Sequence, residues 1–226
     1  MRCILCKTEN SSPIEIFSCS VCKCNYGSFT EPANYDDYGK LYEGMGAYCE
    51  NLKIVPNPWR QAANRGFPYE KIIEFFMNQD QQLDVLDVGC GWGYVDYVLR
   101  GLNFKVRGID ISKEAIDFAT KTYGEFYELK TVQEYEGKHD LILAVEVFEH
   151  LADPKGWLKR CLEIAPRVMI TTPNLSVYKT PWVSEMPPIH MAIYRKKSLE
   201  WLAKDLGVKV EVDDSSLNLI AMFSYL

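Results

Sequence analysis

The chain has 226 residues, of which 47% are hydrophobic and 25% are charged, and its formal net charge at pH 7 is −6. This length suits one medium-sized domain with a small appendage, and the acidic charge disfavours a nucleic-acid binder, which needs a basic face. No apolar run approaches the roughly 20 residues of a membrane span. No signal-peptide core follows the N-terminus, so we expect a cytoplasmic protein.

The N-terminal segment is rich in cysteine, with five of the eight cysteines in the first 24 residues. Without a secretion signal, such clustering indicates metal binding more than disulfides. Cys3 and Cys6 form one C-x-x-C pair, and Cys19 and Cys22 form a second. Four thiolates at this spacing can close a tetrahedral, structural Zn²⁺ site. Cys24 can replace Cys22, so the fourth ligand stays open, and free cysteines in a small β-hairpin are the alternative.

Three regions follow from the composition. We interpret residues 1–30 as a zinc-ribbon-like module and residues 31–64, rich in Tyr, Asn, Gly and Pro, as a connector with an N-terminal helical segment. Residues 65–226 form the main domain. Its first helix begins near Pro68, because apolar residues recur there at helical spacing.

The main domain alternates strands and helices. The patterns predict strands at 85–88, 105–109, 126–129, 140–145, 167–171, 208–212 and 218–224, and helices at 94–100, 113–121, 155–164 and 198–205. Ser112 is the expected N-cap of the second of these helices. This alternation predicts an α/β fold with a doubly wound, parallel sheet and crossover helices.

The first strand of this pattern stops at three alternating glycines, Gly89, Gly91 and Gly93. Glycine lets the backbone turn sharply and lets a ligand approach, and a strand, a glycine turn and a helix together make a nucleotide site. Asp87 would repel the pyrophosphate of a dinucleotide and attract an ammonium group, as in S-adenosylmethionine. Tyr94 stands where a dinucleotide fingerprint has its last glycine, which also disfavours a dehydrogenase.

A second acid, Asp110, ends the next strand, where a carboxylate binds ribose hydroxyls. Three motifs therefore occur in order: VLDVGCGWG at 85–93, GIDIS at 108–112 and DLILAVEVFEHL at 140–151. Over most of residues 65–226 the chain resembles a class I S-adenosylmethionine-dependent methyltransferase. The resemblance implies a seven-stranded, Rossmann-like sheet whose last strand is antiparallel.

The resemblance also implies roles for residues around the cofactor. The glycine turn, with Cys90 inside it, would cradle the methionine part, Asp110 would hold the ribose, and Ile111 would pack on the adenine. Thr131 and Val132 would flank the adenine, and Glu146 would contact the cofactor. The alternatives are a loop-bracing role for Asp87 and a plain helix start at Gly93. Cys90 and Cys161 also have the character of core residues.

Glu146, Glu149 and His150 follow the fourth strand and would share one face if a helix began there. Glu149 or His150 could accept a proton from a substrate hydroxyl, or the three could bind a divalent cation such as Mg²⁺. Similar segments hold a metal in ubiquinone-biosynthesis and some antibiotic-sugar O-methyltransferases, whereas many relatives carry Glu-His with no metal. A loop-bracing role is the alternative.

Two other histidines were considered. His190 resembles a histidine that lies close to the acceptor in the same relatives, and it is a second candidate general base. His139 precedes a strand and is expected at the surface. The segment Trp182–Met191 is interpreted as a substrate-covering loop, and the loop at Thr171–Asn174 lines the acceptor pocket in relatives.

The predicted function is transfer of a methyl group from S-adenosylmethionine to a small molecule, with O-methylation of a sugar or of a nucleotide- or lipid-linked glycan precursor favoured. The N-terminal segment resembles zinc ribbons fused to methyltransferases of sugars and natural products, although Lys7 and Lys23 replace the usual glycines. Alternatives are a phenol, quinone or natural-product acceptor, an RNA- or protein-directed enzyme, and a non-catalytic partner protein.

Overall fold

The computed structural model describes residues 69–177 and 190–226, together with the backbone of Ile16–Ser18 and Asn25–Gly27. The cysteine pairs, the boundaries predicted near residues 30 and 64, and residues 182–189 of the predicted covering loop lie outside the described residues. The chain forms two compact units, residues 34–143 and residues 1–33 together with 144–226.

Seven strands form one sheet in the order β5-β4-β3-β6-β7-β10-β9. Their bounds are β3 Asp84–Val88, β4 Lys105–Asp110, β5 Tyr127–Leu129, β6 Leu141–Val145, β7 Arg167–Pro173, β9 Lys209–Asp213 and β10 Asn218–Ser224. Strand β3 pairs in parallel with β4 and β6, and β4 pairs in parallel with β5. Strand β10 runs antiparallel to both β7 and β9. The predicted seven-stranded Rossmann-like sheet with an antiparallel last strand is confirmed.

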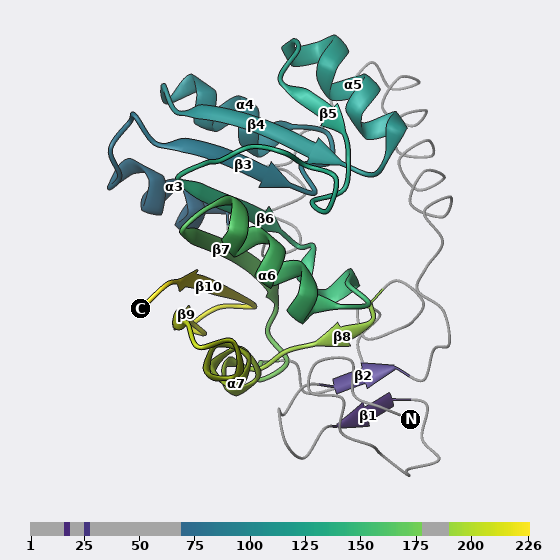
Figure 1. Ribbon diagram of the computed structural model, residues 1–226, viewed down its shortest axis with the longest axis vertical. Helices are drawn as coiled ribbons and strands as arrows, with labels where there is room; N and C mark the ends of the chain where they lie inside the picture. Colours follow the sequence, from purple (N-terminus) through teal and green to yellow (C-terminus); the bar gives the residue numbers. More distant parts are fainter. Residues whose placement is uncertain (1–15, 19–24, 28–68, 178–189) are drawn as a thin grey trace. The chain divides into compact units, whose positions relative to one another are not determined.

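In the described part of the unit of residues 34–143, which begins at Tyr69, three helices accompany the strands (Figure 1). They are α3 Tyr69–Met77, α4 Tyr94–Gly101 and α5 Lys113–Tyr123. The last four residues of β3 are buried, as expected for a parallel strand covered on both faces. Phe76 of α3 packs edge-on against Phe104, with ring centroids 5.1 Å apart. Helix α5 begins where predicted, because the Ser112 hydroxyl accepts a hydrogen bond from the backbone N–H of Ala115.

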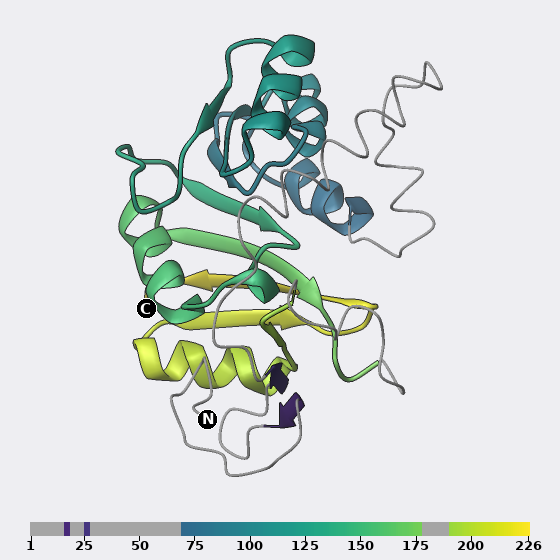
Figure 2. The same ribbon diagram turned by 90° about the vertical axis from the view of Figure 1, so that its right-hand side faces the viewer.

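In the other unit, helix α6 (Pro154–Ile164) packs on β7, and helix α7 (Lys196–Leu206) packs on β9 and β10 (Figure 2). The Asp153 side chain caps α6 by accepting a hydrogen bond from the Gly156 N–H, and Pro154 occupies the first helical turn, where its missing N–H costs nothing. Gly207 ends α7 in the left-handed conformation, with φ of 69°.

A second, three-stranded sheet has the order β1-β2-β8. Strand β1 (Ile16–Ser18) pairs antiparallel with β2 (Asn25–Gly27), and β2 pairs antiparallel with β8 (Ala192–Ile193). The N-terminal hairpin is therefore joined by backbone pairing to the strand that begins two residues after His190.

Two local predictions are wrong. The segment from Glu146 to His150 does not start an α-helix: only a 3₁₀ turn, η1 (Phe148–His150), forms, because Glu146 has a left-handed backbone with φ of 55°. His139 is not a surface residue. Its side chain is 5% exposed and makes hydrogen bonds with the Tyr135 hydroxyl (2.7 Å) and the Asp84 carboxylate (2.6 Å).

None of the helices in the described ranges combines the length and the apolar composition that crossing a bilayer requires.

Candidate active site

The glycine turn lies at the end of β3 and is fixed by backbone hydrogen bonds to β4. Gly89, Gly91 and Gly93 all have positive φ, at 82°, 51° and 74°. The N–H groups of Gly89 and Cys90 both donate to the Ile109 carbonyl, at 2.8 and 3.1 Å. Three left-handed residues in five explain the alternating glycines, because side chains other than glycine rarely adopt this conformation.

Position 93 requires glycine for two reasons, its positive φ and the lack of room for a side chain. It is the N-cap of α4, and a Cβ added there would lie 2.5 Å from the Tyr127 hydroxyl. That hydroxyl donates to the Gly93 carbonyl at 3.1 Å and accepts from the Arg100 guanidinium at 2.6 Å. Tyr127 therefore fills the place of a side chain at position 93 and ties β5 to the start of α4.

Asp110 braces the glycine turn from β4. One carboxylate oxygen accepts from the Gly91 N–H and the other from the Ser112 N–H, both at 2.8 Å. Burial raises the pKa of Asp110, and these hydrogen bonds partly offset the rise. Each carboxylate oxygen keeps a further lone pair, so the same side chain has the capacity to accept ribose hydroxyls.

Apolar side chains beside Asp110 fit an aromatic base. Ile111 is 38% exposed, which is unusual for a large apolar residue that follows a buried strand. Leu129, which pairs with Asp110 in the β4–β5 register and is 50% exposed, is a similar residue that sequence reasoning missed. Thr131 binds the Glu134 carboxylate through its N–H and hydroxyl, whereas Val132 is buried.

Asp87 lies just before the turn and is 3% exposed. Its Oδ1 atom is buried and has no hydrogen-bond partner among the described residues. Burial, followed by the nearby Asp96 carboxyl, raises the pKa of Asp87 well above its usual value. A buried carboxylate oxygen without a partner is costly, and a cationic ligand group would satisfy it. The turn, the braced Asp110 and this oxygen together fit S-adenosylmethionine, which carries an ammonium group and a ribose.

A second group of side chains surrounds Glu146 in the unit that contains β7 and β10. Thr171 and Asn218 both donate to the Glu146 Oε1 atom, at 2.9 and 2.8 Å. The Glu146 N–H also binds Thr171. These bonds hold a backbone conformation that costs about 1–3 kcal/mol in a non-glycine residue. Burial, then the Glu149 carboxylate, raises the pKa of Glu146 well above its usual value.

Glu149 is also buried, at 1% exposure. Its Oε2 atom accepts from the Thr172 hydroxyl at 3.0 Å, and its backbone carbonyl accepts from the Met191 N–H at 2.8 Å. Burial raises the pKa of Glu149 to about 7. Thr171, Thr172 and Asn218 were not singled out as supports, because their partners are 23 to 72 residues away in the chain.

The two candidate histidines lie together beside Glu149. The ring centroids of His150 and His190 are 4.7 Å apart, and the His150 Nε2 atom is 3.8 Å from the Glu149 carboxylate. One ligand atom from each of the three residues lies within 4.8 Å of the others. We call these three residues the Glu-His-His cluster. The predicted residues Glu149, His150 and His190 are thus brought together, whereas Glu146 is held by Thr171 and Asn218.

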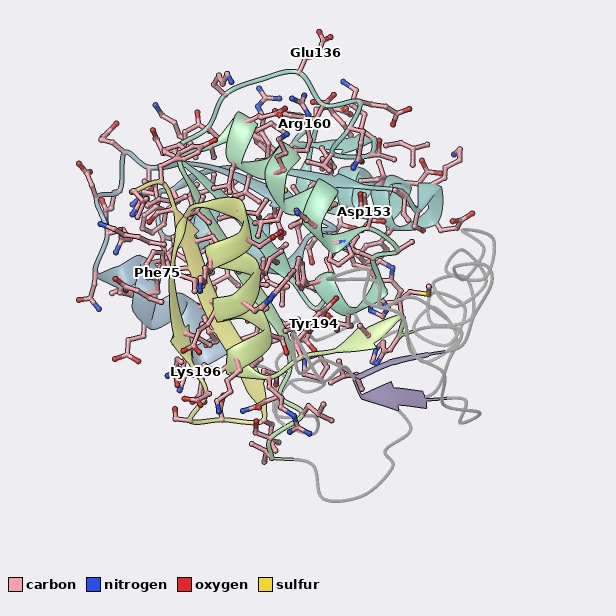
Figure 3. The ribbon with its side chains drawn as sticks, turned by 60° about the horizontal axis from the view of Figure 1, so that its bottom comes forward. Phe75, Glu136, Asp153, Arg160, Tyr194 and Lys196 are labelled. Carbon is pink, nitrogen blue, oxygen red and sulfur yellow. The ribbon has the colours of Figure 1, made fainter. Side chains whose placement is uncertain are left out.

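Tyr194 supports the short turn that carries this cluster. It is fully buried, its ring centroid lies 5.0 Å from that of Phe148, and its hydroxyl donates to the Phe148 carbonyl at 3.5 Å. Figure 3 labels it close to the start of α7, which begins two residues later at Lys196. Tyr194 thereby links the segment after His190 to η1.

Comparison with known proteins gives one family and several relatives. Residues 59–211 match the family model described as a methyltransferase domain. The ubiquinone biosynthesis O-methyltransferase of Thiobacillus denitrificans is 33% identical over 89 residues, which are 35% of this chain and 38% of that protein. The mitochondrial ubiquinone biosynthesis O-methyltransferase of Saccharomyces cerevisiae is 30% identical over 102 residues, 41% of this chain and 33% of that protein. The matches span about a third of the length of these curated relatives.

Among solved structures, magnesium protoporphyrin IX methyltransferase from Synechocystis PCC 6803 with bound SAM aligns with a TM-score of 0.64. The identity is 14%, and the alignment covers 88% of this chain and 100% of that chain. At this identity the likeness shows a shared fold. The family match covers more than half of the chain and includes both the glycine turn and the segment from Glu146 to His150, so the chain belongs to the class I S-adenosylmethionine-dependent methyltransferase family.

Proposed function

We propose that the protein transfers the methyl group of S-adenosylmethionine to a hydroxyl oxygen of a small-molecule acceptor. The observation that carries this proposal is the Glu-His-His cluster, in which two imidazoles and a buried carboxylate lie within reach of one another. An acceptor hydroxyl has to lose its proton during methyl transfer, and imidazole is the commonest general base near neutral pH.

Residues of the glycine turn have the binding role. The positive-φ glycines bring the backbone close to the ligand, Asp87 binds the ammonium group, and Asp110 accepts from the ribose hydroxyls. Ile111 and Leu129 offer apolar surface to the adenine. When bound, S-adenosylmethionine supplies a methyl group on a positively charged sulfur, and transfer to an oxygen depends mainly on positioning.

His150 is the first candidate for the base and His190 the second. The acceptor proton moves to a ring nitrogen of His150, and the Glu149 carboxylate 3.8 Å away stabilises the resulting imidazolium. Glu149 acts as a positioning residue here, because it is buried and fixed by Thr172. Since the pKa of Glu149 is raised to about 7, its charge, and with it the activity, should increase as the pH rises through neutrality.

The proposed acceptor belongs to one of two chemical classes. The sequence resemblance favours a sugar or a nucleotide- or lipid-linked glycan precursor. The curated relatives are ubiquinone biosynthesis O-methyltransferases, which favours an acceptor of the phenol or quinone type. An aliphatic sugar hydroxyl depends on a base far more than a phenol does, because a phenol ionises near pH 10.

The Glu-His-His cluster also has the composition of a metal site. Two imidazoles and one carboxylate suit a borderline cation such as Zn²⁺ or Mn²⁺ better than Mg²⁺, which prefers oxygen ligands. In that role the residues would bind a cation that orients and acidifies the acceptor hydroxyl. The structural Zn²⁺ at Cys3, Cys6, Cys19 and Cys22 stays a separate proposal, which rests on the spacing of the two C-x-x-C pairs alone, because these cysteines lie outside the described residues.

Transfer of a labelled methyl group from S-adenosylmethionine to a panel of nucleotide sugars and catechols tests the proposal. We expect His150→Ala to lower kcat by about 10²-fold or more with unchanged binding of S-adenosylhomocysteine. His139→Gln, a histidine change outside the cluster, should leave kcat intact. Loss of activity with EDTA and recovery with Zn²⁺ or Mn²⁺ would assign the metal role, whereas EDTA-resistant activity would assign the simple base. Failure of S-adenosylhomocysteine to bind would refute the function itself.

A further inference from the structure

A buried carboxyl beneath the glycine turn has no role in the scheme above. Asp96 lies in the first turn of α4 and is fully buried. Neither of its oxygens has a hydrogen-bond donor in the described part of the chain. Such a group costs free energy on folding, so its retention points to a task in ligand binding.

The absence of a side chain at Gly108 makes room for this carboxyl. A Cβ at position 108 would lie 2.5 Å from the Asp96 Oδ2 atom and 2.7 Å from the Cys90 Sγ atom. In the β3–β4 register Gly108 pairs with Asp87. Asp96 therefore reaches over the strand position beside Asp87, close enough for a hydrogen bond between the two carboxyls once one of them carries a proton.

The groups around this carboxyl pair come from every neighbouring element. Asp110 of β4 and the Cys90 thiol of the turn interact electrostatically with the pair, and Arg100 of α4 and Tyr127 of β5 interact with Asp96. Burial raises the pKa of Asp96 to about 6, although the Arg100 guanidinium and Asp87 partly oppose the rise. The pKa of Asp87 is also raised well above its usual value, by burial first and then by Asp96. Two adjacent buried carboxyls cannot both ionise, so the pair retains one proton near neutral pH.

We propose that Asp87 and Asp96 share one proton in the ligand-free protein, and that binding of the ammonium group of S-adenosylmethionine or its demethylated product expels this proton to solvent. The inference rests on the proposed function, because it requires the cofactor to bind at the glycine turn. The positive charge of the ammonium group takes the place of the proton, so both carboxylates become ionised in the complex. Asp96 is then a positioning residue, which acts on the ligand through Asp87.

Calorimetric titration with S-adenosylhomocysteine in phosphate, HEPES and Tris buffers measures the protons released, because these buffers differ in ionisation enthalpy. At pH 7 we expect release of about one proton per chain, and a Kd that falls up to about tenfold per pH unit between pH 6 and 8. 5′-Methylthioadenosine, which lacks the amino-acid part, should bind without release.

The substitution Asp96→Asn tests the same proton release by changing the protein instead of the ligand. The amide can donate to Asp87 and carries no charge, so proton release should fall by roughly half or more and the pH dependence of Kd should flatten. Asp117→Asn, which removes an exposed ion-pair partner of Lys113, is the control and should match the wild type.

Several results would overturn the inference: binding by the wild type without proton release, equal release by Asp96→Asn, or equal release with 5′-methylthioadenosine. If Asp96→Asn does not fold, the proton release measured with the wild type and the two ligands still tests the inference. Absence of any binding would instead refute the proposed function, so the two failures are distinguishable.

Discussion

Gly93 offers a quantitative test of how the glycine turn is built. Gly93→Ala places a side chain on a residue with φ of 74° and puts its Cβ 2.5 to 2.6 Å from three atoms of Tyr127. Gly207→Ala at the end of α7 is the matched control, because Gly207 has φ of 69° and nothing within 4 Å of an added Cβ. The two changes thus share the backbone strain and differ in the steric contact.

The magnitudes follow from the two contributions. A left-handed alanine costs about 1–2 kcal/mol, and the reduced freedom of the unfolded chain returns about 0.4–1 kcal/mol. We therefore expect Gly207→Ala to lower the free energy of unfolding by about 1 kcal/mol. Overpacking against Tyr127 adds about 1–3 kcal/mol, so Gly93→Ala should lower it by about 2–4 kcal/mol and should also weaken binding of S-adenosylhomocysteine.

Urea denaturation followed by circular dichroism, with m-values compared between variants, measures these losses. A double-mutant cycle with Tyr127→Leu isolates the contact, because leucine lacks the hydroxyl and the outer ring atoms that meet the Cβ. In that background the cost of Gly93→Ala should fall to the Gly207→Ala value. Equal losses for the two alanine variants, or additive effects of Gly93→Ala and Tyr127→Leu, would refute the steric reasoning.

Three further changes test local electrostatics and capping. The pKa of Glu149 rises from 4.5 in the unfolded chain to about 7 in the folded protein. A carboxyl whose pKa is raised by folding stabilises the fold at low pH, and this stability is lost as the pH rises. In EDTA, the wild type should therefore lose about 2–3 kcal/mol of stability through Glu149 between pH 5 and pH 8. In urea melts at several pH values, Glu149→Gln should reduce the loss of stability by this amount and leave the part that Glu146, Asp87 and Asp96 contribute. The exposed Glu200→Gln should keep the full loss. Thr172→Val removes a donor to the Glu149 carboxylate and should move the same loss of stability to higher pH. Ser112→Ala should cost about 1 kcal/mol in thermal or urea melts, because it removes the N-cap of α5.

The candidate cofactor residues could be predicted because their signals are local in sequence. The turn from Gly89 to Gly93 has an alternating pattern that only a left-handed backbone requires, and Ser112 caps a helix three residues downstream. Asp110 was placed correctly at the end of its strand, yet its use of both oxygens to brace the turn depends on how β3 and β4 pair.

The contacts of Glu146 and Glu149 could not be predicted to the same degree, because their partners are distant in the sequence. A helical face for Glu146, Glu149 and His150 was a reasonable expectation from spacing alone. It fails because Thr171 and Asn218, from β7 and β10, hold Glu146 in a left-handed conformation that ends the regular backbone. No pattern within residues 146–150 encodes those partners.

Asp96, near the glycine turn, shows the same limit. In the sequence it is one polar residue in an amphipathic helix, where an exposed position is the usual expectation. Its burial follows from a glycine on a different element, because any side chain at Gly108 would occupy the space of its carboxyl. To predict that Gly108 makes room for Asp96, one has to know the β3–β4 register and the packing of α4 on β4. The burial of Asp96, like the conformation of Glu146, is therefore set by pairs of residues that only the folded chain brings together.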